Sequence, residues 1–289
     1  MTTTDAQQLD HRIAGHTGQL IRLASVRADA LLRAALPPDR TPRDLGVLAV
    51  LADGPLSQAR LGTLLHVNRT VMISVIDDIE AAGLVRRERD PADRRRYALR
   101  ITEEGRAAVP LLREAAVLAE RELTASLTGG QRRRLGVLLR LLVPDLPAPI
   151  AMLLGFLLER ATQRLRAGSE AALTERGLKP RCVRMLVALD AAQPCTQERL
   201  ANAMSLAAPS IVAALDELRA NGLMLSDRNP SDRREQVLRL SENGRDYLAD
   251  ALRAEQAAQH RLAETIGAAE IDELNSLLAK ACGGPGRSA

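Results

Sequence analysis

Apolar side chains recur along the chain every three or four residues, which is the spacing of amphipathic helices. The first long helix of this kind is predicted from Gln19 to Ala35. A second follows the middle of the chain, where Leu154, Leu157, Leu158 and Leu165 share one helix face. The pattern therefore predicts a mainly α-helical protein.

Each long helix is followed by the same series of shorter elements. A short apolar helix comes first, and the next helix is predicted to be N-capped by Ser57 or Thr196. A turn then leads into a further helix that ends near Gly83 or Gly222, where glycine suits a left-handed cap. This order of helix, turn and helix is typical of a DNA-binding unit.

A short β-hairpin is predicted after each of these units. In the first it consists of strands from Leu84 to Glu88 and from Arg96 to Ile101, around a loop rich in charge. Thr102 or Ser241 is predicted to cap the long helix that follows, and a last amphipathic helix places Leu135, Leu138, Leu139 and Leu142 on one face.

The chain contains a long internal repeat. The stretch RDPADRRRYALRITEEGR, which starts at Arg89, returns 139 positions later as RNPSDRREQVLRLSENGR. A period of this size exceeds the roughly 20–50 residues of solenoid repeats, so each copy is a whole domain. The stretch VPDLPAP separates the copies because three prolines in seven residues interrupt a helix. The predicted division is 1–143 for the first copy, 144–149 for a Pro-rich linker, 150–283 for the second copy and 284–289 for a disordered tail.

Composition and charge narrow the class of protein. Charged residues make up 26% and hydrophobic residues 46% of the 289 residues, the balance of a soluble globular protein. The sequence predicts a cytoplasmic protein without signal peptide or membrane span. Basic groups exceed acidic ones by 40 to 36, and 38 of the basic groups are arginine, the better ligand for phosphate and base edges.

The hairpin and helix-turn-helix together resemble the MarR family of bacterial transcriptional regulators. The family's wing typically reads D-x-x-D-R-R, then a strand and T-x-x-G, and Asp90, Asp93, Arg94, Arg95 and the pair Thr102 and Gly105 fit it. The second copy keeps Asp232, Arg233, Arg234, Ser241 and Gly244 but has Asn229 in place of the first Asp.

The resemblance implies a fold and a partner. It implies tandem winged helix-turn-helix domains that form a single-chain pseudo-dimer, with a shared helical dimerisation region near residues 9–35, 103–143, 150–176 and 242–282. The partner it implies is a double-stranded DNA operator, with one helix of each copy in the major groove and the hairpin on flanking backbone or minor groove. A mM-range effective concentration would keep the linked halves together.

The residues predicted to contact DNA come from both copies. In the first copy they are Asn68, Arg69, Thr70, Ser74, Arg86, Arg87, Arg89, Arg94, Arg95 and Arg96. In the second they are Ser210, Arg228, Arg233 and Arg234. Asp93 and Asp232 are expected to hold one arginine of each wing in place. By family analogy Arg95 and Arg234 enter the minor groove, and Arg94 and Arg233 are structural.

The two copies are predicted to bind DNA unequally. Residues 1–143 carry 22 basic and 17 acidic groups, whereas residues 144–289 carry 18 and 19. Family members often have arginines where Ser74 and Ala213, and Asp78 and Glu217, stand in this chain. The second recognition helix is alanine-rich, so an alternative reading is a sensory or protein-interaction module with weak, non-specific DNA binding.

The resemblance also implies a small aromatic or phenolic effector between the dimerisation helices and the winged domain. Polar groups on the first helix that could contact it are His11, His16, Gln19 and Arg22, although surface or capping roles also suit them. His11 and His16 lie about 140° apart around a helix and cannot chelate one metal.

The sequence predicts no enzyme, cofactor or metal site. It has no Gly-rich phosphate loop, no nucleophile paired with histidine and no metal-ligand cluster. Cys182, Cys195 and Cys282 form no CxxC motif and are read as reduced, partly buried thiols, with redox sensing as the alternative.

Overall fold

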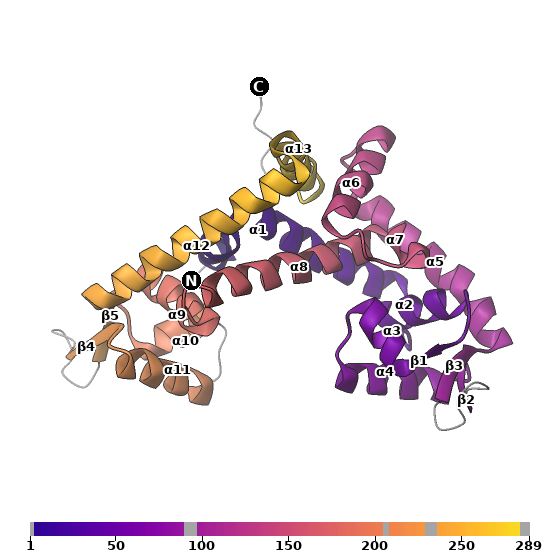
Figure 1. Ribbon diagram of the computed structural model, residues 1–289, viewed down its shortest axis with the longest axis horizontal. Coiled ribbons are helices and arrows are strands. Elements are labelled where there is room, and N and C mark those ends of the chain that lie inside the picture. Colours follow the sequence, from indigo (N-terminus) through magenta and orange to yellow (C-terminus); the bar gives the residue numbers. More distant parts are fainter. Residues whose placement is uncertain (1–2, 90–96, 205–207, 229–235, 284–289) are drawn as a thin grey trace. The chain divides into compact units, whose positions relative to one another are not determined.

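The computed structural model describes residues 3–89, 97–204, 208–228 and 236–283, and for residues 3–16, 203, 208–210 and 228 it describes the backbone alone. The wing tips at 90–96 and 229–235 and the predicted tail at 284–289 lie outside the described residues. The described part is mainly helical with short hairpins (Figure 1). The predicted fold class is confirmed.

The first copy contains six helices and three strands among its described residues. They are α1 (Thr3–Ala35), α2 (Pro42–Leu51), β1 (Leu56–Ser57), α3 (Gln58–Leu65), α4 (Arg69–Ala81), β2 (Val85–Arg89), β3 (Tyr97–Ile101), α5 (Glu103–Leu123) and α6 (Gly129–Leu142). The first helix begins 16 residues before the predicted start at Gln19. Strand β1 was not predicted, and β2 begins one residue later than expected.

The second copy repeats this order within its described residues. A short helix α7 (Ala148–Ala151) begins at the end of the linker, and then come α8 (Leu154–Thr174), α9 (Pro180–Ala192), α10 (Gln197–Met204), α11 (Ala208–Ala220), β4 (Met224–Arg228), β5 (Gln236–Leu240), α12 (Glu242–Ile266) and α13 (Ala268–Ala281). We call α2, α3, α4 and the β2–β3 hairpin the first head, and α9, α10, α11 and the β4–β5 hairpin the second head.

The chain forms two compact units that do not coincide with the two sequence copies. One consists of Leu20–Arg164 with Asp272–Ala289, and the other of Met1–Gln19 with Leu165–Ile271. Helices α1 and α8 each contribute residues to both units. The boundaries of the copies drawn from the sequence therefore describe the repeat, while the packing groups the residues differently.

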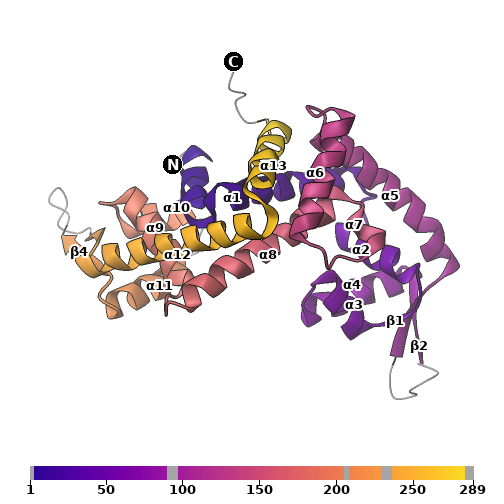
Figure 2. The same ribbon diagram turned by 45° about the horizontal axis from the view of Figure 1, so that its top comes forward.

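The first head is built on an antiparallel sheet of order β1-β3-β2. Leu56 pairs with Leu99, and Val85 pairs with Ile101. Leu45, Leu48, Leu61 and other aliphatic side chains of the helices form the core against this sheet. Helices α3 and α4 lie beside the hairpin, as two views show (Figures 1 and 2).

Residues of the linker and of the segment that follows it complete the core of the first head. Ile150 and Leu153 are buried members of its hydrophobic cluster, and Leu146 and Phe156 pack against that cluster. In the same unit, α13 contacts α6, where Arg134 donates to Glu273 at 2.9 Å. The last helices of the two copies thus meet, as the resemblance implied.

The second head has a two-stranded sheet, β4-β5. Cys195 stands where Leu56 stands in the first copy and forms a single antiparallel bridge with Leu238. Both residues are buried. Helices α9 and α10 pack beside this hairpin, and α12 contacts α9 (Figures 1 and 2).

The T-x-x-G and S-x-x-G motifs fix each hairpin to the helix that follows it. The Thr102 hydroxyl donates to the carbonyl of Gly83 at 2.8 Å and accepts the amide of Gly105 at 3.0 Å. Ser241 makes the same two bonds in the second copy, to Gly222 at 2.7 Å and from Gly244 at 2.9 Å. Gly83 and Gly222 adopt φ of 74° and 65°, the left-handed conformation predicted for helix ends.

Candidate nucleic-acid interface and the adjoining cavity

Helix α4 divides into a buried and an exposed face. Met72, Val75, Ile76 and Ile79 point into the core at helical spacing. The opposite face exposes Arg69, Thr70 and Ser74, which were predicted to contact DNA. An exposed polar helix face about the width of the major groove is the geometry that base reading requires.

The fourth residue predicted for this surface has a local role. The Asn68 side chain accepts the amide of Val71 at 2.9 Å and so caps the start of α4. The carbonyl oxygen of the side chain is therefore used within the helix, and its NH2 group stays available to an outside partner.

An exposed apolar residue on each recognition helix escaped the sequence analysis. Ile73 is 40% exposed, and Val212, at the matching position of α11, is 42% exposed. Both positions fall outside the helical spacing of the buried residues, and this spacing could have predicted their exposure from the sequence. A branched aliphatic side chain on a groove-facing surface can contact the methyl group of thymine.

Arg87 connects the hairpin to the recognition helix. Its guanidinium donates to Asp77 at 2.5 Å and also to Glu80, and its backbone amide donates to Glu80 at 3.1 Å. These bonds, the one to Asp77 first, raise the pKa of the guanidinium. In the structure Arg87 anchors β2 to α4, and its predicted contact with DNA stays a prediction.

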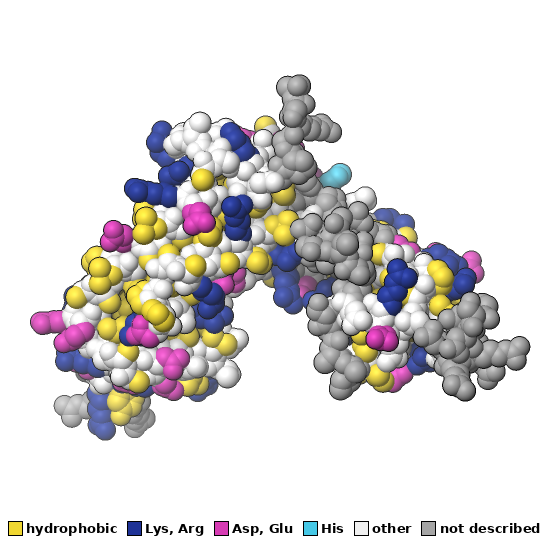
Figure 3. Space-filling model, turned by 180° about the vertical axis from the view of Figure 1, so that it is seen from behind, with side chains coloured by type: hydrophobic (Ala, Val, Ile, Leu, Met, Phe, Trp, Pro, Cys, Tyr) yellow, Lys and Arg dark blue, Asp and Glu magenta, His cyan; other side chains and the backbone are white. Residues whose placement is uncertain are grey.

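Two further strand arginines lie beside carboxylates. Arg86 is 2.7 Å from Glu88, which Arg100 also contacts at 2.7 Å, and Arg89 is exposed. Figure 3 shows arginine side chains next to Asp and Glu on this head, at the left. The predicted wing residues Asp93, Arg94, Arg95 and Arg96 lie outside the described residues.

The second head neutralises the carboxylate on its recognition helix. Glu217 stands where family members often have arginine, and it accepts Lys179 at 3.0 Å and Arg181 at 2.7 Å. The bond from Lys179 is the main cause that lowers the pKa of Glu217. Glu217 therefore points to the start of α9, where two cations offset its repulsion of phosphate.

The structure does not describe the side chains of the other residues predicted to contact DNA in the second head. Asp232, Arg233 and Arg234 lie outside the described residues. Ser210 and Arg228 are placed by their backbone, in α11 and at the end of β4. Arg219, exposed on α11, is paired with Asp216 at 2.7 Å.

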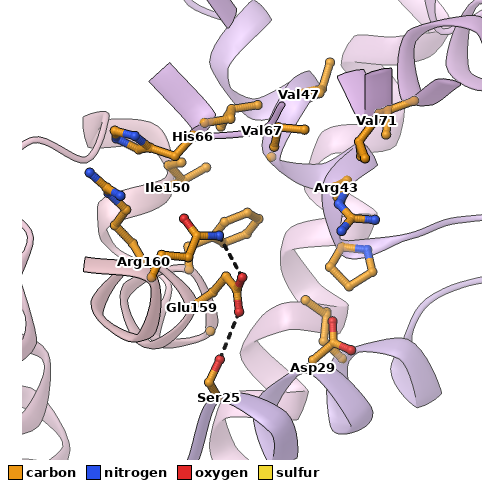
Figure 4. A pocket seen from close by; sticks show the side chains of 18 of the residues that line it. Ser25, Asp29, Arg43, Val47, His66, Val67, Val71, Ile150, Glu159 and Arg160 are labelled. Atoms are coloured by element: carbon orange, nitrogen blue, oxygen red, sulfur yellow. Dashed lines mark hydrogen bonds between the residues drawn. The ribbon is translucent and has the colours of Figure 1, made fainter. Parts of the chain in front are cut away.

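A cavity of about 460 Å³ adjoins the first head (Figure 4). Its walls come from the C-terminal half of α1, from α2, from the turn between α3 and α4, from the first half of α4, and from the linker, α7 and α8. Both sequence copies therefore line it, within a single compact unit.

The cavity has an apolar part and a polar part. Val47, Val71, Ile150 and Phe156 supply aliphatic and aromatic surface. Polar lining residues include Arg43, His66, Arg160, Glu159, Ser25 and Gln163 (Figure 4). The carboxylate of Glu159 accepts hydrogen bonds from Ser25 at 3.2 Å and from Gln163 at 2.8 Å. These two neighbours stabilise its negative charge.

The residues predicted for an effector site lie elsewhere on α1. Gln19 and Arg22 do not line this cavity, and the side chains of His11 and His16 are not among those described. Ser25, Asp29 and Leu32, further along the same helix, line it instead. The ligand role of His11, His16, Gln19 and Arg22 remains a prediction from the resemblance.

The three cysteines are free thiols, and each is at least partly buried. Cys182 and Cys195 are buried, and burial is the main cause that raises the pKa of all three thiols. A raised pKa lowers the thiolate fraction, which disfavours redox sensing. Within the described residues, no cluster of three His, Cys, Asp or Glu suits a metal ion, and no helix is long and apolar enough to span a membrane.

Comparison with known proteins identifies the family. Two models of the MarR family match, one over residues 39–96 and the other over 178–236. A putative transcriptional regulatory protein for the hcr operon of Thauera aromatica is 31% identical over 151 residues, 50% of this chain and 91% of that protein. The chain belongs to the MarR family.

Other proteins match about half of the chain in the same way. The HTH-type transcriptional repressor NicR of Pseudomonas putida is 29% identical over 147 residues, which is 49% of this chain and 93% of that protein. The structure of the transcriptional repressor CouR bound to a 23-mer DNA duplex has 34% identity, covering 46% of this chain and 94% of that one, with a TM-score of 0.40. The chain thus carries two MarR copies, and its relatives are transcriptional regulators and repressors.

Proposed function

We propose that the protein is a sequence-specific DNA-binding repressor with two unequal heads, whose operator affinity a small-molecule effector modulates. The exposed face of α4 carries this proposal, because Arg69, Thr70 and Ser74 are presented together beside the hairpin. These side chains offer donors and acceptors to base edges, while an arginine-rich wing tip supplies contacts to phosphate or minor groove.

The inequality of the heads follows from their recognition helices. Helix α11 exposes Val212, Ala213 and an Asp216 already paired with Arg219. A surface of this kind offers few groups for hydrogen bonds with bases. We therefore expect the first head to define one strong half-site and the second a degenerate one.

The cavity beside the first head suits the effector. Its volume of about 460 Å³ falls within the usual range of small-ligand sites, roughly 300–1,000 Å³. Phe156 and the aliphatic side chains would pack against an aromatic ring, and Arg43 and Arg160 would attract an anionic group. A small aromatic or phenolic anion fits this combination.

An effector changes operator affinity only through its different affinities for two arrangements of the head. The cavity offers such a difference because one wall belongs to the helix-turn-helix and the other to α8. A ligand that requires a different spacing of these walls would shift the head away from DNA.

Selection of duplexes from a random library at about 150 mM salt tests the DNA-binding part of the proposal. The expected result is an enriched motif with one strong and one degenerate half-site. If no motif is enriched and binding disappears as salt rises, the heads hold DNA by charge alone. The alanine-rich α11 would then favour the second candidate function, a sensory or protein-interaction module.

The wings give a quantitative prediction about the two heads. Arg95→Ala is expected to weaken binding to the selected duplex about tenfold, a typical loss for one arginine contact. Arg234→Ala is expected to weaken it less, because the second copy lacks the basic excess of the first. Equal losses in titrations of the two variants would contradict the ranking.

A further inference from the structure

A single carboxylate in the linker contacts two other segments of the same compact unit. Oδ2 of Asp145 lies 3.2 Å from Nε2 of His66 and 2.9 Å from a guanidinium nitrogen of Arg160. Its Oδ1 is 3.7 Å from Arg164, one turn further along α8. Asp145 thus joins the turn before the first recognition helix to a helix of the second copy.

His66 holds a strained position in that turn. It ends α3 with φ of 51° and ψ of 37°, the left-handed conformation, and is the one non-glycine residue with positive φ among the described residues. Such a conformation is unfavourable outside glycine and persists where the surroundings hold it. Two residues later Asn68 caps α4, so the turn that His66 occupies leads directly into the recognition helix.

The charge states of the cluster favour a stable contact at neutral pH. The bond from Arg160 is the main cause that keeps the pKa of Asp145 below its usual range, so Asp145 is ionised. Burial, and then Arg160, lower the pKa of His66, so its imidazole is neutral and can donate from Nε2. Arg160 is left with a buried Nε that has no hydrogen-bond partner in the structure.

Two members of this cluster also face the cavity. His66 and Arg160 line it side by side, and Figure 4 shows both side chains at its left. An anion bound in the cavity would compete with Asp145 for the same guanidinium. The contact is thus placed where occupancy of the cavity can break it.

We propose that Asp145 is the positioning residue that couples the cavity to the first recognition helix. The linker carboxylate holds His66 against Arg160, and an anion that draws Arg160 toward the cavity releases the turn that leads into α4. The anionic effector in this scheme rests on the proposed function, whereas the contact itself does not. The linker carboxylate contacts the turn that leads into α4, so the coupling acts on the first head.

Hydrogen exchange of the full chain, measured by mass spectrometry without any ligand, tests the contact. Asp145→Asn is expected to speed amide exchange across residues 66–71 about tenfold relative to the unchanged chain, as loss of about 1.4 kcal/mol of local stability would. Asp39→Asn is the matched control, because Asp39 is an exposed loop carboxylate in the same unit that pairs with its neighbour Arg40. It is expected to leave this segment unchanged, as is Asp145→Asn for residues 211–220 of the second head.

A second variant separates positioning from general loss of structure. Arg160→Gln is expected to speed exchange of the same turn, and the double variant is expected to add nothing to Asp145→Asn. Unchanged exchange in Asp145→Asn, or equal acceleration in both heads, would overturn the proposal.

A probe ligand connects the contact to the cavity. With 4-hydroxybenzoate in excess, exchange of residues 66–71 in the unchanged chain is expected to approach that of Asp145→Asn, which itself should not respond further. An equal response in both proteins would show that the coupling bypasses Asp145. If the probe has no effect on the unchanged chain while Asp145→Asn exchanges faster, the proposed effector class is wrong and the contact stands.

Discussion

Alanine in place of Gly105 or Gly244 is expected to lower the free energy of unfolding by about 3 kcal/mol, the upper part of the usual range for overpacking. A Cβ atom at Gly105 would clash with the carbonyl oxygen of Leu84 and lie 2.8 Å from Cγ1 of Ile101. At Gly244 it would clash with the carbonyl oxygen of Leu223. A rotamer change cannot relieve either clash, because the opposing oxygen belongs to the backbone of the residue directly before strand β2 or β4.

Urea unfolding followed by circular dichroism measures the loss. Gly168→Ala is a suitable control, since Gly168 is exposed within α8 and nothing lies within 4 Å of its added Cβ. That change is expected to stabilise the protein by about 1 kcal/mol through helix propensity. Unchanged midpoints for both Gly105→Ala and Gly244→Ala would mean that the hairpins do not sit against α5 and α12 as described.

Glu120 is expected to make the protein less stable as the pH rises from about 4.5 to about 7. Its carboxylate accepts the amide of Leu154 at 2.5 Å and so caps the start of α8, with Arg132 as the neighbouring charge. Burial nevertheless raises its pKa from 4.5 to about 7.

The sign follows from proton binding. Between the two pKa values the folded protein binds the proton of Glu120 while the unfolded chain has released it, so a rise in pH favours unfolding. The shift corresponds to at most about 3 kcal/mol, lost by about pH 7 and unchanged above it.

Urea unfolding at pH 5 and pH 8 isolates this contribution. Glu120→Gln keeps a carbonyl acceptor for the amide of Leu154 but cannot titrate, so its loss of stability between the two pH values should be smaller by up to about 3 kcal/mol. Glu114→Gln, on the exposed face of the same helix, should behave like the unchanged chain. Parallel pH profiles for Glu120→Gln and the unchanged chain would contradict the burial of this carboxyl in the native state.

The sequence predicted those features that depend on neighbouring residues. Ser57, Thr102 and Ser241 cap helices as expected, because a cap joins groups three positions apart. The buried face of α6 was also read correctly from its helical spacing. Periodicity and capping are encoded within one turn of chain, so they can be recognised without the fold.

The features that escaped prediction join distant segments. Glu120 meets Leu154 across 34 positions, and Lys179 meets Glu217 across 38. The motif marked Gly105 as significant, but only packing shows that the Leu84 carbonyl excludes a side chain there. The cavity lies further along α1 than His11, His16, Gln19 and Arg22, because helical spacing does not tell which part of a 33-residue helix lines a cavity.

The burial of Ile150 and Leu153 within the core of the first head bears on the history of such a gene. A chain divided after Val143 would encode a first half whose core lacks two buried aliphatic side chains and the packing of Phe156. Both products would have to be made together and to find each other before that half could complete its core. Once a duplication has placed part of one copy's interior beyond the junction, fission of the gene no longer restores two independent proteins.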